Sequence, residues 1–362
     1  MNRADDAAVH FVVPDGIEDA DRVSGGNVYD LRIAEALRAH GLDIRMRSVI
    51  PGGTHALSRA LSHLPRDSVV LIDGLIALAA PDALDAHSSR LRIVVLAHMV
   101  ASAMTGIGDA GGTIERERRA LRAARHVIAT SEWTRAELIA RALAMPRRIT
   151  VVHPGTDAAP VATGSVPVPH MLCVGAVAPH KGQDVLVHAL AGMTDLPGWT
   201  CSIVGSLNAD PAFAARTAAA IRSAGLEERV VLTGALTGER RTEMFLSADL
   251  VVAPSRTESY GMVAAEALAR GIPVVAAHVG GLPEAINGSA AGVLVPADDP
   301  ETLRAVLRQW AGDPDVRAAL KARALVRTAG RTWGESAQIA AAVLIGARRG
   351  VDGAGYERRL AG

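Results

Sequence analysis

The sequence predicts an α/β protein built from two doubly wound parallel sheets. Short apolar segments alternate with helical segments along the chain, which is typical of parallel strands joined by crossover helices. Residues 156–169 interrupt this alternation with proline, glycine and small polar residues, which indicates a linker. The length of 362 residues also favours two domains, each large enough for its own core.

The first domain is expected to cover residues 1–160. Its strands are predicted at residues 9–13, 44–49, 69–72, 91–97, 126–130 and 149–153, with helices between them, for example at 28–40 and 134–142. The second domain is expected to cover residues 165–332. Its strands are predicted at 171–174, 200–204, 230–233, 250–253 and 274–277, and its helices at 183–191, 211–224, 239–246, 261–270, 283–286 and 300–311.

A last helix is expected at about residues 333–350, and it could pack back on the first domain. Ligands of doubly wound sheets bind outside the carboxyl ends of the strands. Two such domains that face each other would place a ligand in the cleft between them.

Composition excludes several classes of function. The formal net charge is zero and the basic residues are scattered, so we expect no nucleic-acid partner. Cys173 and Cys201 lie inside predicted strands as core residues, which indicates neither a disulfide framework nor a metal site. No apolar run reaches the ~18 residues of a membrane span. The N-terminal residues lack the apolar core of a signal peptide. The two core cysteines predict a reducing cytoplasm, and peripheral membrane contact is left open.

Residues 255–273 are the most informative segment, because they place Glu258 and Glu266, with seven residues between them, between two predicted strands. Glu258 falls on the turn after the first of these strands, and a short helix follows. The backbone N–H groups at the start of that helix, from Ser259, Tyr260, Gly261 and Met262, suit a phosphate or another anion. Carboxylates next to a phosphate cradle suit a ligand that carries both sugar hydroxyls and phosphates, which is the outline of a nucleotide-sugar site.

Three further features have a functional and a plain structural interpretation. Lys181, one of two lysines in the chain, lies on the loop between a predicted strand and helix, where it could neutralise a diphosphate or simply be solvated. Gly25 and Gly26 separate the first strand from the first helix and would allow close backbone approach to a ligand, although such pairs are common in turns. His98 follows an apolar strand and could donate to a sugar hydroxyl or serve as a structural residue.

The sequence resembles glycosyltransferase family 4, the retaining, nucleotide-sugar-dependent transferases of GT-B fold in the group 1 glycosyl transferases. The resemblance rests on the two glutamates with their seven-residue spacing, continued by residues 280–284 (GGLPE), and on the loop of residues 174–182 (VGAVAPHKG). Residues 124–135 and 151–157 are similar to the elements that close the first domain of such enzymes.

The resemblance implies a role for each matching residue. Glu266 would bind the ribose hydroxyls of the donor, and Glu258 with the amides of residues 259–262 would hold the transferred sugar and the diphosphate. Lys181 would face the diphosphate. Gly25 and Gly26 would close over it from the first domain, and His98 would lie near the transferred sugar. The loop after Gly234 would grip the base.

One position departs from the family pattern. Many members carry an arginine directly after the glycine of the phosphate loop, where this chain has Ala176. Lys181 would then supply more of the positive charge, and Arg256 is a conceivable substitute or a residue that merely covers the helix.

The resemblance implies a retaining transferase that moves a hexose from a UDP- or GDP-sugar to a small-molecule, glycan or lipid-linked acceptor, without a cofactor or a divalent metal. Two alternatives keep the same fold: a catalytically idle binding or regulatory subunit, and a nucleotide-sugar epimerase. A nicotinamide oxidoreductase is disfavoured because the chain lacks the spaced three-glycine fingerprint.

Overall fold

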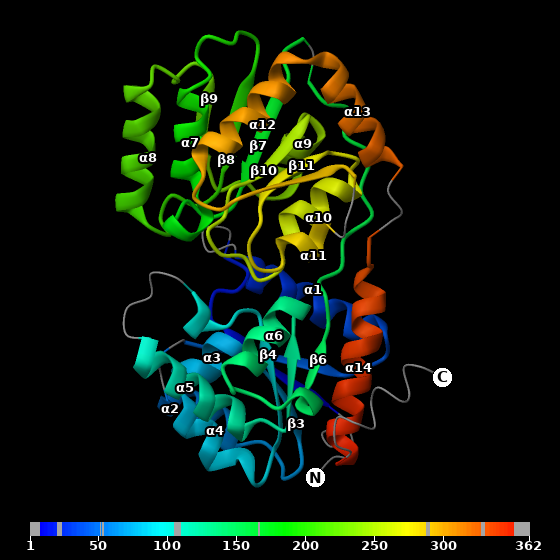
Figure 1. Ribbon diagram of the computed structural model, residues 1–362. Helices are drawn as coiled ribbons and strands as arrows, with labels where there is room; N and C mark the ends of the chain where they lie inside the picture. Colours follow the sequence, from blue (N-terminus) through cyan, green and yellow to red (C-terminus); the bar gives the residue numbers. More distant parts are fainter. Residues whose placement is uncertain are drawn as a thin grey trace. The chain divides into compact units, whose positions relative to one another are not determined.

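The computed structural model describes residues 8–19, 24–50, 52, 54–104, 110–165, 167–286, 290–326 and 330–350. The chain divides into two compact units (Figure 1). Unit 1 takes the described residues within 1–18, 25–155 and 331–362, and unit 2 takes those within 19–24 and 156–330. The last helix therefore belongs to the first unit, although it follows the second in sequence.

Unit 1 alternates strands and helices and ends with a helix from the C-terminal part of the chain. Its elements are β1 (Val9–Pro14), α1 (Gly25–Ala39), β2 (Ile44–Val49), α2 (Thr54–Ser62), β3 (Val69–Asp73), α3 (Gly74–Ala79), α4 (Pro81–Ser88), β4 (Arg92–Ala97), α5 (Ala110–Ala123), β5 (His126–Ala129), α6 (Glu132–Ala140), β6 (Ile149–Val151) and α14 (Trp333–Arg349).

The strands of unit 1 form one parallel sheet in the order β2-β1-β3-β4-β5-β6. Most of the strand residues are fully buried, as expected for a sheet that is covered by helices on both faces. The chain runs outward to β2 from β1 and then returns to β3 on the other side of β1. The sheet thus has its topological switch point between β1 and β3, where doubly wound folds bind ligands.

Helix α14 (red in Figure 1) lies beside α1 and completes the cover of this sheet. The ring of Trp333 packs edge-on against Tyr29 with centroids 5.4 Å apart, and the hydroxyl of Ser336 donates to the carbonyl of His153 over 2.7 Å. A Cβ added to Gly155 would lie 2.3 Å from the backbone nitrogen of Trp333. Close packing at the start of α14 therefore requires glycine at position 155.

Unit 2 repeats the same alternation. Its elements are β7 (His170–Val174), α7 (Gln183–Ala191), β8 (Thr200–Val204), α8 (Pro211–Ser223), β9 (Val230–Gly234), α9 (Gly238–Leu246), β10 (Leu250–Ala253), α10 (Met262–Ala269), β11 (Val274–Ala277), α11 (Leu282–Ile286), β12 (Gly292–Val295), α12 (Pro300–Gly312) and α13 (Pro314–Leu325).

The second sheet is also parallel, in the order β12-β11-β10-β7-β8-β9. Its switch point lies between β7 and β10, the first and fourth strands of the unit. Two clusters of buried apolar side chains occupy this unit, one that includes Trp199 and Trp310 and one that includes Phe245 and Leu268. The sheet is therefore packed on both faces, and its loops at the carboxyl ends are left to carry the chemistry.

Two six-stranded parallel sheets confirm the predicted fold class. Each predicted strand is present within two residues of its expected bounds. Strand β12 was not predicted, because it is four residues long and only Val295 in it is fully buried. Helix α1 begins at Gly25 rather than at residue 28, so the two glycines form its first turn instead of a separate loop. Within the described part of the chain, no helix combines the length and the apolar character that a membrane crossing demands.

Candidate functional site

Charged side chains gather at the switch point of each sheet. In unit 2 they follow β7 and β10, and in unit 1 they follow β3 and β4 or lie on the helix after β1.

Lys181 and Glu258 meet at the switch point of unit 2. The ammonium of Lys181, on the loop after β7, donates to Oε2 of Glu258, on the turn after β10, over 2.6 Å. About a quarter of the lysine side chain and a fifth of the glutamate side chain are exposed. Both groups are thus paired with each other and still accessible to a ligand.

The backbone around Glu258 is held from two sides. The N–H of Gly281 donates to the carbonyl of Glu258 over 2.9 Å, and the N–H of Arg256 donates to the carbonyl of His180 over 2.8 Å. Gly280 has φ of +55°, and a Cβ at this position would lie 1.7 Å from the Glu258 carbonyl oxygen. The GGLPE segment therefore has a physical role: its glycines let the loop after β11 press against the turn that carries Glu258.

Glycine is also required at two other points near this turn, one on the loop after β7 and one at the start of α10. Gly182 has φ of +67°, and a Cβ there would lie 2.1 Å from the carbonyl oxygen of Pro254. Gly261 is the N-cap of α10 with φ of +105°, and a Cβ there would lie 2.6 Å from the side chain of Leu282. These approaches bring the loop after β7 and the start of α10 to the same edge of the sheet.

A small pocket opens between these two loops. It has a mixed lining of apolar side chains, the Lys181–Glu258 pair and the amide of Gln183. Its lining residues are Cys173, Val174, Lys181, Gln183, Ala253, Pro254, Ser255, Glu258, Gly261, Val263, Ala264 and Leu282.

Glu266 lies one turn into α10 and is not a lining residue of this pocket. Its Oε2 accepts from Nη2 of Arg241, on α9, over 2.7 Å, and 17% of the glutamate side chain is exposed. The guanidinium of Arg241 also lies 5.0 Å from the ring centroid of Phe245, a cation–π contact. Any ribose that binds Glu266 must share this carboxylate with Arg241.

Arg256 is engaged in structural contacts. Its guanidinium forms a two-point pair with Asp184 at 2.8 Å for each bond, and it also contacts Asp298 at 2.6 Å and the carbonyl of Pro179 at 2.6 Å. These contacts join the turn after β10, which carries Arg256, to the loop after β7 and to α7, and they already occupy the guanidinium. The lysine that faces Glu258 is Lys181.

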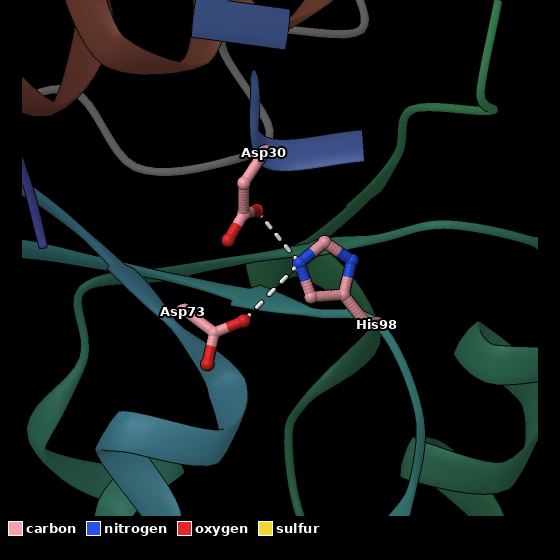
Figure 2. A group of neighbouring side chains, drawn as sticks. All are labelled: Asp30, Asp73 and His98. Carbon is pink, nitrogen blue, oxygen red and sulfur yellow. Dashed lines mark hydrogen bonds and ion pairs between the residues drawn. The ribbon is translucent and has the colours of Figure 1, made fainter. Parts of the chain in front are cut away.

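His98 lies at the switch point of unit 1 with two aspartates (Figure 2). Its Nε2 is 2.7 Å from Oδ1 of Asp30 and 3.2 Å from Oδ2 of Asp73. Asp30 comes from α1, Asp73 ends β3 and His98 directly follows β4, so three elements converge on one imidazole nitrogen. The side chains of Asp30 and Asp73 are almost fully buried, and one tenth of the His98 side chain is exposed.

The environment shifts both titrating groups of this cluster. Burial alone would lower the pKa of His98, but the charge and hydrogen bond of Asp30, together with Asp73, outweigh it and raise that pKa to about 10. Burial raises the pKa of Asp30 to about 6, although the neighbouring His98 acts in the opposite direction. The aspartates therefore favour the charged form of His98 over the neutral form.

The structure brings some predicted residues together and leaves others apart. Gly26 lies against His98, since a Cβ there would be 3.3 Å from Cδ2 of the ring. Gly25 precedes it at the start of α1. Gly234 ends β9, two strands away from β7, and does not line the pocket. Ser259, Tyr260 and Met262 surround the N-cap of α10 without lining the pocket themselves.

Sequence reasoning missed Asp30, Asp73 and Arg241. Asp73 had a usable signal, because it directly follows a buried strand as His98 does, and the carboxyl ends of neighbouring parallel strands meet. Asp30 lies inside a helix and Arg241 on a polar helix face. Neither position differs in sequence pattern from an ordinary surface residue.

The two groups offer different chemistry. In unit 2 a compact cation, a carboxylate and the N-terminus of α10 face one pocket, which suits a ligand with both phosphates and hydroxyls. In unit 1 an imidazole that is flanked by two aspartates and lies beside the first turn of α1 suits hydrogen bonding to a hydroxyl or a developing negative charge.

Comparison with known proteins finds a family match in unit 2. Residues 166–327 match the family described as glycosyl transferases group 1. D-inositol 3-phosphate glycosyltransferase of Kineococcus radiotolerans is 33% identical over 268 residues, which cover 66% of this chain and 62% of that protein. The enzyme of the same name from Streptomyces scabiei is 33% identical over 248 residues, which cover 63% and 55% of the two chains. The chain thus matches less than two thirds of the length of these relatives.

Solved structures share the fold at low sequence identity. A sucrose-phosphate synthase from Thermosynechococcus elongatus has a TM-score of 0.77 and 22% identity, with 93% of this chain and 98% of that chain covered. The Anabaena protein HepE in complex with UDP and glucose has a TM-score of 0.73 and 19% identity, with 94% and 99% covered. These likenesses show the GT-B fold.

Proposed function

We propose that the protein is a glycosyltransferase that uses a nucleotide diphosphate sugar. The premise is that the resemblance predicted from the sequence is confirmed, since residues 166–327 of unit 2 match the glycosyl transferases group 1 family. The observation that carries the proposal is the Lys181–Glu258 pair in a pocket at the switch point of unit 2, beside the N-terminus of α10. Donor diphosphate would take the place of Glu258 on Lys181, and the freed carboxylate would accept hydroxyls of the sugar.

The proposed reaction moves a hexose with retention of configuration. The bond between the anomeric carbon and the β-phosphate oxygen breaks while the acceptor hydroxyl bonds to the same face of that carbon. The acceptor proton passes to the leaving phosphate oxygen, so no protein nucleophile takes part. Lys181 and the N–H groups at the start of α10 would stabilise the negative charge that develops on the diphosphate, a contribution often worth ~3 kcal/mol per donor. The proposal requires no divalent metal.

The names of the curated relatives suggest the first acceptor to test. Those relatives are glycosyltransferases of D-inositol 3-phosphate, so we propose a small phosphorylated or polyhydroxylated acceptor, with an inositol phosphate as the first candidate. The donor sugar and base are open between UDP- and GDP-hexoses.

The first test is a thermal-shift panel of UDP-, GDP-, ADP- and dTDP-sugars, with and without EDTA. A donor at 100 times its dissociation constant stabilises the fold by about 2.7 kcal/mol. A selective shift that EDTA leaves unchanged supports the metal-independent donor site and names the base. That donor is then incubated with inositol 3-phosphate, and product is sought by mass spectrometry.

Two results would contradict the proposal. If no nucleotide sugar produces a shift, the idle-subunit alternative is favoured. If the sugar is altered in the absence of any acceptor, the epimerase alternative is favoured.

A further inference from the structure

The cluster of Asp30, Asp73 and His98 fixes the proton on one histidine nitrogen. Both carboxylates approach Nε2, at 2.7 and 3.2 Å, and carboxylates only accept hydrogen bonds when ionised. Nε2 must therefore carry a proton. Figure 2 shows the second ring nitrogen, Nδ1, on the opposite side of the ring from the two carboxylates.

Each aspartate is itself anchored by the fold. Oδ1 of Asp73 accepts the N–H groups of Leu75 and Ile76 at 2.8 and 3.1 Å, which caps α3 and leaves Oδ2 for His98. Asp30 is fully buried on α1, and its Oδ2 has no hydrogen-bond partner. A buried carboxylate that is half unsatisfied is costly unless a positive charge lies beside it, and His98 is the charge that the structure supplies.

Two further described neighbours of the ring, Tyr29 and Thr130, add no positive charge beside it. Tyr29 packs edge-on against the ring with centroids 5.2 Å apart, and its hydroxyl donates to the carbonyl of Val152 over 2.9 Å. Burial raises the pKa of Tyr29 well above its usual value, with Asp30 adding to this effect and Arg331 opposing it, so the phenol stays neutral. Thr130 contacts only the backbone carbonyl of His98, over 3.2 Å.

We propose that Asp30 and Asp73 are positioning residues that hold His98 as an imidazolium, with Nδ1–H left for the substrate. This inference rests on the proposed function in taking the ligand to be a nucleotide sugar. His98 would donate through Nδ1 to a hydroxyl or an anionic oxygen of the substrate. The two aspartates would act only through His98.

The three side chains are also close enough to act as metal ligands, since their ligand atoms lie within 4.8 Å of one another. The distances favour a direct hydrogen bond instead. Ligand atoms at ~2.0–2.2 Å around a tetrahedral zinc ion are separated by roughly 3.3 Å or more. Nε2 and Oδ1 of Asp30 are 2.7 Å apart, which is the length of a charge-assisted hydrogen bond.

The direct test is the protonation state of His98 in the protein without substrate, measured by ¹⁵N NMR from pH 5 to pH 10. His98→Gln assigns the signal, and Asp43→Asn, an exposed aspartate of the same unit, is the matched control. We expect a doubly protonated ring at pH 7 in the wild type and in Asp43→Asn. Asp30→Asn should lower the titration midpoint of His98 by about one to three pH units, and Asp73→Asn should lower it less.

The kinetic test separates positioning from simple structural damage. Asp30→Asn should move the alkaline limb of the kcat profile to lower pH, so that the loss of turnover grows by about tenfold for each pH unit above the new midpoint. The KM for the donor should change little. A uniform loss of kcat at every pH, with the His98 titration unmoved, would overturn the proposal.

Two further outcomes would also overturn it. One is a neutral His98 ring at pH 7 in the wild type. The other is displacement of the Nε2 proton by added Zn²⁺ or Mn²⁺, which would make the cluster a metal site. The NMR measurement does not require turnover. Absence of transfer with every donor would refute the proposed function, and the NMR titration would still decide the charge of His98.

Discussion

The two switch points hold their charges in opposite ways. In unit 1 the side chains of Asp30 and Asp73 are 0% and 3% exposed, and they surround one histidine. In unit 2 Lys181 and Glu258 form a single pair with side chains that are 25% and 20% exposed. The first arrangement is complete within the fold, whereas the second can exchange its partner for a ligand.

Energetics explain why this difference matters. Removing one member of a buried ion pair costs about 3–5 kcal/mol, because the remaining charge is left without compensation. A partly exposed pair contributes only about 0–1 kcal/mol, since water screens it. If the proposed function holds, the Lys181–Glu258 bond can be given up to a diphosphate at little cost, whereas the buried His98 cluster is costly to disrupt.

The largest expected effect comes from the turn that carries Glu258. Gly280→Ala adds a Cβ that would lie 1.7 Å from the Glu258 carbonyl oxygen, at φ of +55°. Strain at positive φ and the steric overlap together should cost about 4 kcal/mol of unfolding free energy. Gly198→Ala is the matched control, since its φ is +72° and nothing lies within 4 Å of the added Cβ.

The control should lose only about 1 kcal/mol, and urea unfolding of the two variants measures the difference. Equal losses would show that the contact between the GGLPE loop and Glu258 does not constrain this turn. The turn that carries Glu258, and with it the Lys181–Glu258 pair, would then not be held rigidly by the loop after β11.

Loss of the cation should affect turnover and spare stability. Lys181→Ala removes the charge that would stabilise the leaving diphosphate, so kcat should fall by about 10²-fold, or ~3 kcal/mol. The free energy of unfolding should change by less than about 1 kcal/mol. Lys181→Arg keeps the charge in a bulkier group and should retain intermediate turnover.

Parallel measurements of kcat and urea unfolding test this separation. Full turnover in both lysine variants would remove Lys181 from the mechanism. A loss of stability as large as the loss of turnover would mean that the pair is structural, like the cluster of unit 1.

Glu266 provides a smaller test on the ligand side. Glu266→Gln removes the charge that would accept the ribose hydroxyls and that now pairs with Arg241. Hydrogen bonds to charged groups are worth about 1.5–3 kcal/mol, so the dissociation constant of the nucleoside diphosphate should rise by about 30-fold. Calorimetric titration measures it, with the exposed Glu243→Gln of α9 as the control. Equal affinities for the two variants would place the ribose elsewhere.

The sequence was sufficient for the sheets and for part of each site. Apolar runs such as residues 69–72 predict strands because full burial leaves an unbroken apolar pattern, and glycine and proline mark their ends. Lys181 and Glu258 were placed at one site because each follows a strand and the family pattern names both. Their mutual bond was not foreseen, since parallel strands that are neighbours in the sheet can be far apart in sequence.

Two of the unforeseen residues, Asp30 and Arg241, share one physical cause. Asp30 becomes important because α1 turns that side chain toward the ends of β3 and β4. A helix hides the direction of each side chain from a one-dimensional pattern until its packing is known. The same holds for Arg241, which meets Glu266 from a different helix.

A second histidine of unit 1 sharpens the comparison through pH. His126, at the start of β5, is 3% exposed and hydrogen-bonded to Thr150 at 2.9 Å. Burial, with the charge of Arg148 adding to it, lowers the pKa of His126 to about 4. In His98 the same burial is outweighed by two carboxylates. The partner, rather than the depth, therefore decides the charge of a buried histidine here.

The sign of the effect on stability follows from proton linkage. The folded pKa of His126 lies below the value of about 6.5 for an unfolded histidine, so between these values the unfolded chain binds more protons and stability falls as the pH drops. Between pH 7 and pH 5 the wild type should lose about 1–2 kcal/mol more than His126→Gln, as measured by urea unfolding at each pH. Identical losses would indicate that His126 is already charged in the fold, and burial would then not be enough to neutralise this histidine.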